Sequence, residues 1–121
     1  MRLCDCRAES PPESLIRLTL HDAGVPAPVP QWKVFDAGGY FVARVDFAWP
    51  ELSLALEYDG QWHADRDQLA RDRSRIRKLN AAGWYVYPVT SADLRDMAGF
   101  VASINELIVV RSRVVSNCRA T

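Results

Sequence analysis

The sequence predicts an α/β domain in which a mixed four-stranded sheet is flanked by helices. A helical apolar stripe opens the chain, and three segments rich in Val, Phe and Leu follow with only turns between them. A charged helical segment then leads to a fourth such segment. Strands joined by short turns pair antiparallel, whereas a strand reached through a helix joins its neighbour parallel. The expected order of elements is therefore α-β-β-β-α-β-α.

Composition indicates one domain. The 121 residues are 49% hydrophobic and carry a formal net charge of zero, which suits a domain that folds unaided. We expect this domain over residues 10–110, between a flexible N-terminus, 1–9, and a flexible C-terminal tail, 111–121. Because the whole chain is neutral, any affinity for nucleic acid must come from local clusters of charge.

The cysteines and the hydropathy indicate a compartment. Three cysteines are an odd number that suits a reducing environment. No apolar stretch reaches the ~20 residues that a membrane-spanning helix requires. We therefore expect a cytoplasmic protein without membrane contact.

The first helix begins after Ser10. Ser10 is a suitable N-cap, Pro11 and Pro12 fit the first turn, and Glu13 stands three residues after the cap, as in a capping box. Gly24 ends the helix. Glu13 can serve as the cap or as a supporting acid of a nearby site, and the sequence leaves both roles open.

Three strands are expected next, over residues 31–36, 41–49 and 52–58. A Pro-rich connection over residues 25–30 precedes them, a Gly-Gly pair provides the first turn, and Pro50 interrupts the chain at the second. The three strands form an antiparallel meander.

Two carboxylates stand within these apolar strands. If the second turn is short, Asp46 lies opposite Glu57 and Ala48 opposite Ala55. Opposed like charges, with Cβ atoms ~5 Å apart, destabilise a sheet unless a cation compensates, and period-two alternation adds Asp59 to the same face. Carboxylate oxygens suit Mg²⁺ or Mn²⁺. The alternative is a solvated acidic face with arginines as partners.

Residues 64–82 predict a helix with an excess of positive charge. Asp72 occupies a core-facing position of its apolar stripe and needs a cationic partner. We expect that partner to be an arginine near the acidic face. The basic side chains can contact phosphate or remain solvated, and both interpretations stay open because i,i+4 pairs neutralise part of the charge. These side chains are Arg71, Arg73, Arg75 and Lys78.

A fourth strand and one last helix complete the domain. The strand covers residues 84–89, and Pro88 indicates that it lies at an edge of the sheet. Thr90 and Ser91 then cap a helix whose apolar stripe runs from Leu94 to Ile108.

Four short motifs occur in a particular order along this framework. They are Ser10-Pro11-Pro12-Glu13-Ser14, Val45-Asp46-Phe47-Ala48, Ala55-Leu56-Glu57-Tyr58-Asp59-Gly60 followed by His63, and Arg71-Asp72-Arg73 before Gly83-Trp84. With the element order, they resemble the PD-(D/E)xK nuclease superfamily and, more narrowly, its very-short-patch-repair-like domain of unknown function family 559. The resemblance covers residues 10–96 and implies a restriction-endonuclease-like fold. Where the superfamily places a Lys two residues after the Glu, this chain has Asp59.

The resemblance implies a divalent-metal-dependent endonuclease that hydrolyses the phosphodiester bonds of DNA. Asp46 and Glu57 match the superfamily's metal-binding acids, and His63 is the candidate general base or acid. Asp59 would be a third ligand or would orient His63, and Gln61 would hold a water or a phosphate. The expected phosphate contacts are Arg71, Arg73, Arg75 and Lys78.

The missing Lys keeps a second function open. The chain would then be a catalytically inactive member of the fold that binds nucleic acid or protein in a defence or toxin-antitoxin system. No helix-turn-helix, zinc finger or aromatic stacking platform is evident, so target choice would come from another domain, a partner or DNA structure. Nucleases of the superfamily often pair to cut both strands, which makes a homodimer a further expectation.

Overall fold

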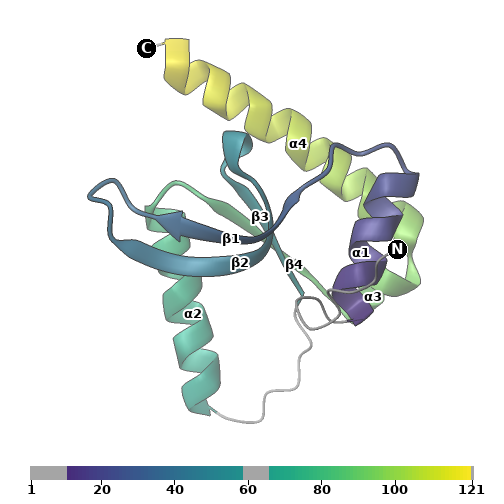
Figure 1. Cartoon of the computed structure of the whole chain (residues 1–121), viewed down its shortest axis with the longest axis horizontal. Helices are drawn as coiled ribbons and strands as arrows, with labels where there is room; N and C mark the ends of the chain where they lie inside the picture. Colours follow the sequence, from purple (N-terminus) through teal and green to yellow (C-terminus); the bar gives the residue numbers. More distant parts are fainter. Residues whose placement is uncertain (1–10, 59–65, 121) are drawn as a thin grey trace.

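A computed structural model describes residues 11–58 and 66–120 of the chain (Figure 1). The elements in order are α1 (Pro11–Asp22), β1 (Val29–Phe35), β2 (Phe41–Trp49), the 3-10 turn η2 (Pro50–Leu52), β3 (Leu54–Tyr58), α2 (Arg66–Ala81), β4 (Tyr85–Val89), α3 (Ser91–Arg95) and α4 (Met97–Ala120). Within these ranges, no helix combines the length and the apolar character needed to cross a membrane.

The four strands form one mixed sheet in the order β1-β2-β3-β4. The first three strands pair antiparallel, and β4 joins β3 parallel after the crossover through α2. The α/β fold class expected from the sequence is therefore confirmed, including the parallel fourth strand. Both outer strands contain a proline, Pro30 on β1 and Pro88 on β4, a residue that sheets accept mainly at their edges.

The register between β2 and β3 is the one that the sequence predicted. Ala48 pairs with Ala55 and Phe47 with Leu56, and one further step along this antiparallel register places Asp46 opposite Glu57. The connection is tight because η2 folds back on itself and Ser53, with a φ of 49°, donates its N–H to the Pro50 carbonyl.

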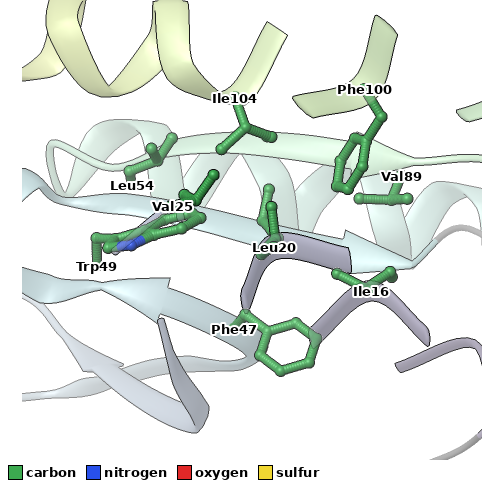
Figure 2. Close-up of a cluster of buried hydrophobic side chains, with 10 residues drawn as sticks. Ile16, Leu20, Val25, Phe47, Trp49, Leu54, Val89, Phe100 and Ile104 are labelled. Atoms are coloured by element: carbon green, nitrogen blue, oxygen red, sulfur yellow. The ribbon is translucent and has the colours of Figure 1, made fainter. Parts of the chain in front are cut away.

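One hydrophobic core lies between the sheet and the helices α1 and α4. Figure 2 shows its large side chains, which come from both helices, from three strands and from the loop after α1. The buried residues of this core are Ile16, Leu20, Val25, Phe47, Trp49, Leu54, Leu56, Val89, Phe100 and Ile104. Burying each such aliphatic or aromatic side chain contributes about 1.5–3 kcal/mol. The indole of Trp49 also donates to the Pro26 carbonyl at 2.8 Å, so its polar atom is satisfied.

A second core joins the sheet to α2. Leu79 of α2 packs with small and branched side chains of the strands, namely Val34, Ala43, Val45, Ala48 and Ala55. Leu54 and Leu56 belong to the first core and Ala55 to the second, so β3 alternates between the two faces. Because Glu57 continues the series of Ala55, its side chain points toward α2.

Three strands begin at different residues from those expected, and the smallest difference is at β4, which begins at Tyr85 instead of residue 84. Strand β1 starts at Val29 instead of residue 31, because Val29 and Pro30 already pair with Ala48 and Phe47. Strand β3 starts at Leu54 instead of residue 52, because η2 takes up the first residues of the expected strand.

The single last helix expected from the sequence is in fact two helices. Thr90 caps α3 through a reciprocal capping box with Asp93, and the helix ends at Arg95 with Asp96 as its C-cap. The Asp96 carboxylate then accepts the Gly99 N–H at 3.1 Å, as an N-cap does for a new helix. The local N-cap interaction therefore outweighs the continuous apolar pattern.

The segment from residue 111, expected as a flexible tail, belongs to α4 as far as Ala120. Arg111 explains part of this order. Its guanidinium donates to the carbonyls of Leu52 at 3.1 Å, Ser53 at 3.5 Å and Gly83 at 3.0 Å. One side chain of α4 thus joins the β2–β3 turn to the α2–β4 turn.

Candidate functional site

The acid pair lies on the central strands of the sheet. Asp46 is on β2 and Glu57 is on β3, and the register of the hairpin brings them to the same level. The Tyr58 N–H donates to Oδ2 of Asp46 at 2.9 Å. This bond orients the Asp46 carboxylate toward the end of β3, where the two acids meet.

Arg75 of α2 supplies the positive charge at this site. Its Nη1 donates to Oε1 of Glu57, and its Nη2 donates to Oε2 at 2.5 Å, so the ion pair is bidentate. Nη2 also donates to the Arg44 carbonyl on β2 at 2.5 Å. The side chains are partly buried, with 18% of Glu57 and 29% of Arg75 exposed. Bidentate pairs of this kind are stronger and more directional than single hydrogen bonds.

This ion pair bears on two expectations, of which the phosphate contact of Arg75 stays a prediction. Arg75 was expected to contact phosphate, but in the structure both of its terminal nitrogens are engaged within the chain. The expected arginine at the acidic face is present, although it binds Glu57. Asp72 lies near enough to act electrostatically on both members of the pair.

Burial raises the pKa of the Glu57 carboxyl above its ordinary value. The Arg75 guanidinium opposes that shift, and the Asp46 and Asp72 carboxylates add to it. The hydrogen bond to Glu57 raises the pKa of Arg75, against the effect of its own burial. Arg75 therefore remains charged throughout the ordinary pH range.

The other predicted basic residues lie on the outer side of α2. Arg71, Arg73 and Lys78 are exposed, so they remain available to a ligand, and their role in binding phosphate stays a prediction. Glu13 is half-buried in the first turn of α1. Its role as a supporting acid likewise stays a prediction.

Three predicted site residues fall outside the part of the chain that the structure describes. Asp59, Gln61 and His63 follow directly after β3. Their predicted roles as ligand, water holder and general base or acid are therefore untested. The N-cap role of Ser10 is untested for the same reason.

The described residues offer two carboxylates to a divalent cation. Among them, no three His, Cys, Asp or Glu side chains form a group that could hold a metal ion. Mg²⁺ commonly takes only one or two protein carboxylates and keeps several waters, so Asp46 and Glu57 fit this ion chemically. Glu57 would first have to exchange Arg75 for it.

Two contacts of the site were missed by sequence reasoning. The Tyr58 N–H and the Arg44 carbonyl are backbone groups and carry no residue-specific signal. The sequence did carry a signal that Arg75 is the arginine beside the acid pair. Asp72, Arg75 and Leu79 follow one another at helical spacing and share the core-facing side of α2. Leu79 is fully buried, which places Arg75 one turn away on the same side.

Two curated proteins of Mycobacterium tuberculosis are similar to this chain in sequence. They are uncharacterized protein MT2308 of strain CDC 1551 / Oshkosh and uncharacterized protein Rv2248 of strain ATCC 25618 / H37Rv, each 42% identical over 100 residues. The match covers 82% of this chain, and the chain spans 36% of the length of each relative. No protein-family model matches the chain, so membership of family 559 stays a prediction.

The fold is similar to that of an endonuclease catalytic domain of known structure. The homing endonuclease I-Bth0305I catalytic domain superposes on this chain with a TM-score of 0.66 and 19% sequence identity, and the match covers 85% of this chain and 98% of that domain. At this identity the likeness concerns the fold alone. The chain therefore has the fold of an endonuclease catalytic domain.

Proposed function

We propose that this protein is a divalent-metal-dependent endonuclease that hydrolyses phosphodiester bonds of DNA. The observation that carries the proposal is the opposition of Asp46 and Glu57 on adjacent central strands. Arg75 compensates one carboxylate of this pair, and the remaining negative charge of Asp46 and Asp72 beside it would favour a divalent cation. The endonuclease fold of the chain adds support.

Asp46 and Glu57 would hold the ion, which we propose to be Mg²⁺ or Mn²⁺. The bound ion would supply Lewis-acid polarisation of the scissile phosphate and a lower pKa for an attacking water. Asp46 is suited to this task because Tyr58 fixes one of its oxygens and leaves the other for a ligand. Asp59 would add a further carboxylate oxygen.

Arg75 would move between two partners in the catalytic cycle. Before DNA binds, its guanidinium satisfies Glu57. A phosphodiester offers the same pair of oxygens, because guanidinium binds carboxylate and phosphate in the same bidentate geometry. Arg75 would thus release Glu57 to the metal and contact the phosphate, as the sequence predicted. Arg71, Arg73 and Lys78 would add phosphate contacts that do not depend on base sequence.

Proton transfer would fall to His63. The unperturbed pKa of a histidine lies near working pH, so His63 could take a proton from the attacking water or give one to the leaving oxygen. Asp59 would orient its imidazole if it is not itself a ligand of the ion, and Gln61 would hold a water or a phosphate oxygen.

The second candidate function is a catalytically inactive module that binds nucleic acid or protein. The observation that favours it is the occupation of both Glu57 oxygens by Arg75. If this pair never opens, Glu57 serves structure alone, and the exposed cations of α2 would still attract nucleic acid. The defence or toxin-antitoxin setting, the homodimer and a separate recognition domain remain proposals of the same standing.

The test is nicking of supercoiled plasmid in Mg²⁺, Mn²⁺ or EDTA. The key variant is Asp46→Asn, because its amide oxygen can still accept the Tyr58 N–H while the negative charge is lost. Glu57→Gln tests the second acid, and Glu106→Gln, at an exposed position of α4, is the matched control for removal of a carboxylate.

We expect the wild type and Glu106→Gln to nick DNA with a metal and to be inactive in EDTA. We expect Asp46→Asn and Glu57→Gln to lose about 100-fold or more of the rate, a scale typical of removing a group that stabilises charge in the transition state. Folded protein that fails to cut with either metal would support the inactive module. Equal cutting by Asp46→Asn would remove that residue from the site.

A further inference from the structure

Three aromatic side chains are exposed together at the tip of the β1–β2 hairpin. Phe35 ends β1, Tyr40 precedes β2 and Phe41 begins it, and 52%, 75% and 58% of these residues are exposed. We call this group the hairpin tip. The tip is the end of the hairpin that projects beyond α2 in Figure 1. The sequence did not reveal an aromatic platform because the turn separates its members.

The turn that carries the hairpin tip is held by four hydrogen bonds. Oδ1 of Asp36 accepts the N–H groups of Gly38 and Tyr40, both at 2.9 Å. The Asp36 N–H donates to the Tyr40 carbonyl, and the Gly39 N–H donates to the Asp36 carbonyl, again at 2.9 Å. Gly39 has a φ of 86°, which this turn requires and which glycine adopts without strain. The turn is therefore preorganised.

The aromatic rings are also positioned by their neighbours. Phe35 and Phe41 pack edge to face, with ring centroids 5.8 Å apart and an interplanar angle of 73°. The ring of Tyr40 lies over Gly38, where an added Cβ would come within 3.3 Å of it. Rings ordered in this way lose little conformational entropy when they bind a planar ligand.

Two cations stand beside the hairpin tip. Lys33 and Arg44 are direct partners across the β1–β2 ladder, and both are exposed. Like charges opposed in this way destabilise a hairpin. In the described ranges, neither side chain forms an ion pair with an acid. An anionic ligand would relieve their repulsion.

Strand β2 connects these features to the acid pair. Arg44 and Asp46 are two residues apart on this strand, and the Arg44 carbonyl accepts from Arg75, the partner of Glu57. Asp46 lies five positions after Phe41 on β2, which is about 16 Å at ~3.3 Å per residue. A stacked nucleic-acid strand covers this distance with about five nucleotides, at ~3.4 Å each.

We infer that the hairpin tip is a base-stacking site for unpaired nucleotides, with Lys33 and Arg44 binding the adjacent phosphates. Aromatic rings next to cations match the two halves of a nucleotide, the planar base and the charged phosphate. The inference rests on the proposed function only for where the cleaved bond lies, about five nucleotides from the stacked bases. It gives the protein a preference for single-stranded or frayed DNA near the cut.

The test measures binding of a fluorescein-labelled oligothymidine of about 12 nucleotides by fluorescence anisotropy, a length within the usual site size of single-strand binders. All proteins carry Asp46→Asn, so cleavage does not enter the readout. The test variant is Tyr40→Ala, and Tyr85→Ala is the matched control, because Tyr85 is an exposed tyrosine, 45% accessible, on the opposite edge of the sheet. Tyr40→Phe keeps the ring, and Tyr40→Leu keeps an apolar side chain without it.

We expect Tyr40→Ala and Tyr40→Leu to weaken binding about tenfold, as loss of one base–aromatic stack does. Tyr40→Phe and Tyr85→Ala should bind within about twofold of the parent protein. On an abasic oligonucleotide of the same length, the parent and Tyr40→Ala should bind equally, because no base remains to stack. Tyr40→Ala should leave the salt dependence of binding unchanged. Lys33→Ala should make the plot of log affinity against log salt concentration less steep, by the amount expected for one phosphate contact, about one.

Three results would overturn the inference. One is an unmeasurable affinity of the parent protein for the oligonucleotide. Another is equal binding by Tyr40→Ala and the parent. The third is a loss of affinity in Tyr40→Ala that is equally large on the abasic strand, or that Tyr40→Leu does not show. In either case the hairpin tip would contact something other than bases, such as a protein. The nicking assay decides the nuclease proposal separately, so either can fail alone.

Discussion

Arg75 of α2 holds both carboxylate oxygens of Glu57 on β3 and ties them to the Arg44 carbonyl on β2. One guanidinium thereby joins the crossover helix to two central strands at the level of the acid pair. It also lies in the field of Asp46 and Asp72. The charge balance of the site is thus set within the chain before any ligand arrives.

The first prediction concerns this pair. Without a partner, the opposed acids would make Glu57→Gln stabilising, because the change removes repulsion. With Arg75 in place we expect Glu57→Gln and Arg75→Met each to lower the free energy of unfolding by about 2 kcal/mol, since each leaves a partly buried charge without its partner. Urea denaturation in metal-free buffer measures both changes.

The double variant Glu57→Gln/Arg75→Met separates the pair from its surroundings. We expect its loss of unfolding free energy to be smaller than the sum of the two single losses by about 1–2 kcal/mol, because the two residues are coupled. Arg77→Met, at an exposed position of α2, is the control and should change stability by less than about 0.5 kcal/mol. Additive single changes would mean that the ion pair does not form in solution.

A second prediction separates charge from hydrogen bonding at Asp46. Asp46→Ala leaves the Tyr58 N–H without its acceptor, so we expect a loss of about 1 kcal/mol. Asp46→Asn keeps an acceptor oxygen and should stay within about 0.5 kcal/mol of the wild type. Thermal melting followed by circular dichroism measures both. Equal destabilisation by the two variants would show that the charge of Asp46, and not its hydrogen bond, supports the fold.

Tyr87 provides a prediction about alkaline pH. Burial raises the pKa of its phenol, the Asp93 carboxylate adds to the shift, and the hydroxyl donates to Oδ1 of Asp93 at 3.4 Å. A raised folded-state pKa means that the neutral phenol stabilises the fold. This contribution is complete below the unfolded value of about 10 and is lost as pH rises through the folded pKa.

Unfolding free energies of the wild type and Tyr87→Phe, compared from neutral to strongly alkaline pH, test this sign. We expect the wild type to lose stability relative to Tyr87→Phe above a pH of about 10. Tyr85→Phe serves as the tyrosine control. If the wild type became more stable relative to Tyr87→Phe as the phenol ionised, the direction given for the Tyr87 pKa shift would be wrong.

A fourth prediction concerns Arg111. Its guanidinium donates to three carbonyls that close two turns, so we expect Arg111→Ala to lower the free energy of unfolding by about 1–3 kcal/mol. Arg113→Ala removes an exposed arginine two residues away and should change it by less than about 0.5 kcal/mol. Equal effects of the two changes would show that the contacts of Arg111 contribute nothing beyond surface charge.

The strands and their pairing could be predicted because their signals are local. Alternation of apolar residues, the Gly-Gly turn and Pro50 determine the register of the hairpin, and from that register follows the opposition of Asp46 and Glu57. The crossover helix between β3 and β4 similarly implies a parallel pair. These features needed no knowledge of distant contacts.

Other features depend on contacts that a linear pattern does not contain. Helical spacing places Arg75 on the side of Leu79, but the contact of its guanidinium with Glu57 depends on the packing of Leu79 against the sheet. The order of residues 111–120 follows in part from Arg111 reaching carbonyls 58 and 59 positions away. Asp96 interrupts a continuous apolar stripe because its own side chain caps the next turn.

The prolines of the two outer strands limit how copies of this protein can assemble. Proline has no N–H to offer, so a fifth strand laid along β1 at Pro30 or along β4 at Pro88 would find a gap in its ladder. Open sheet edges are the usual templates for aggregation and for dimers built by strand exchange. The two prolines therefore disfavour edge-to-edge pairing of copies at these positions, and a contact through helices or loops would avoid the gap.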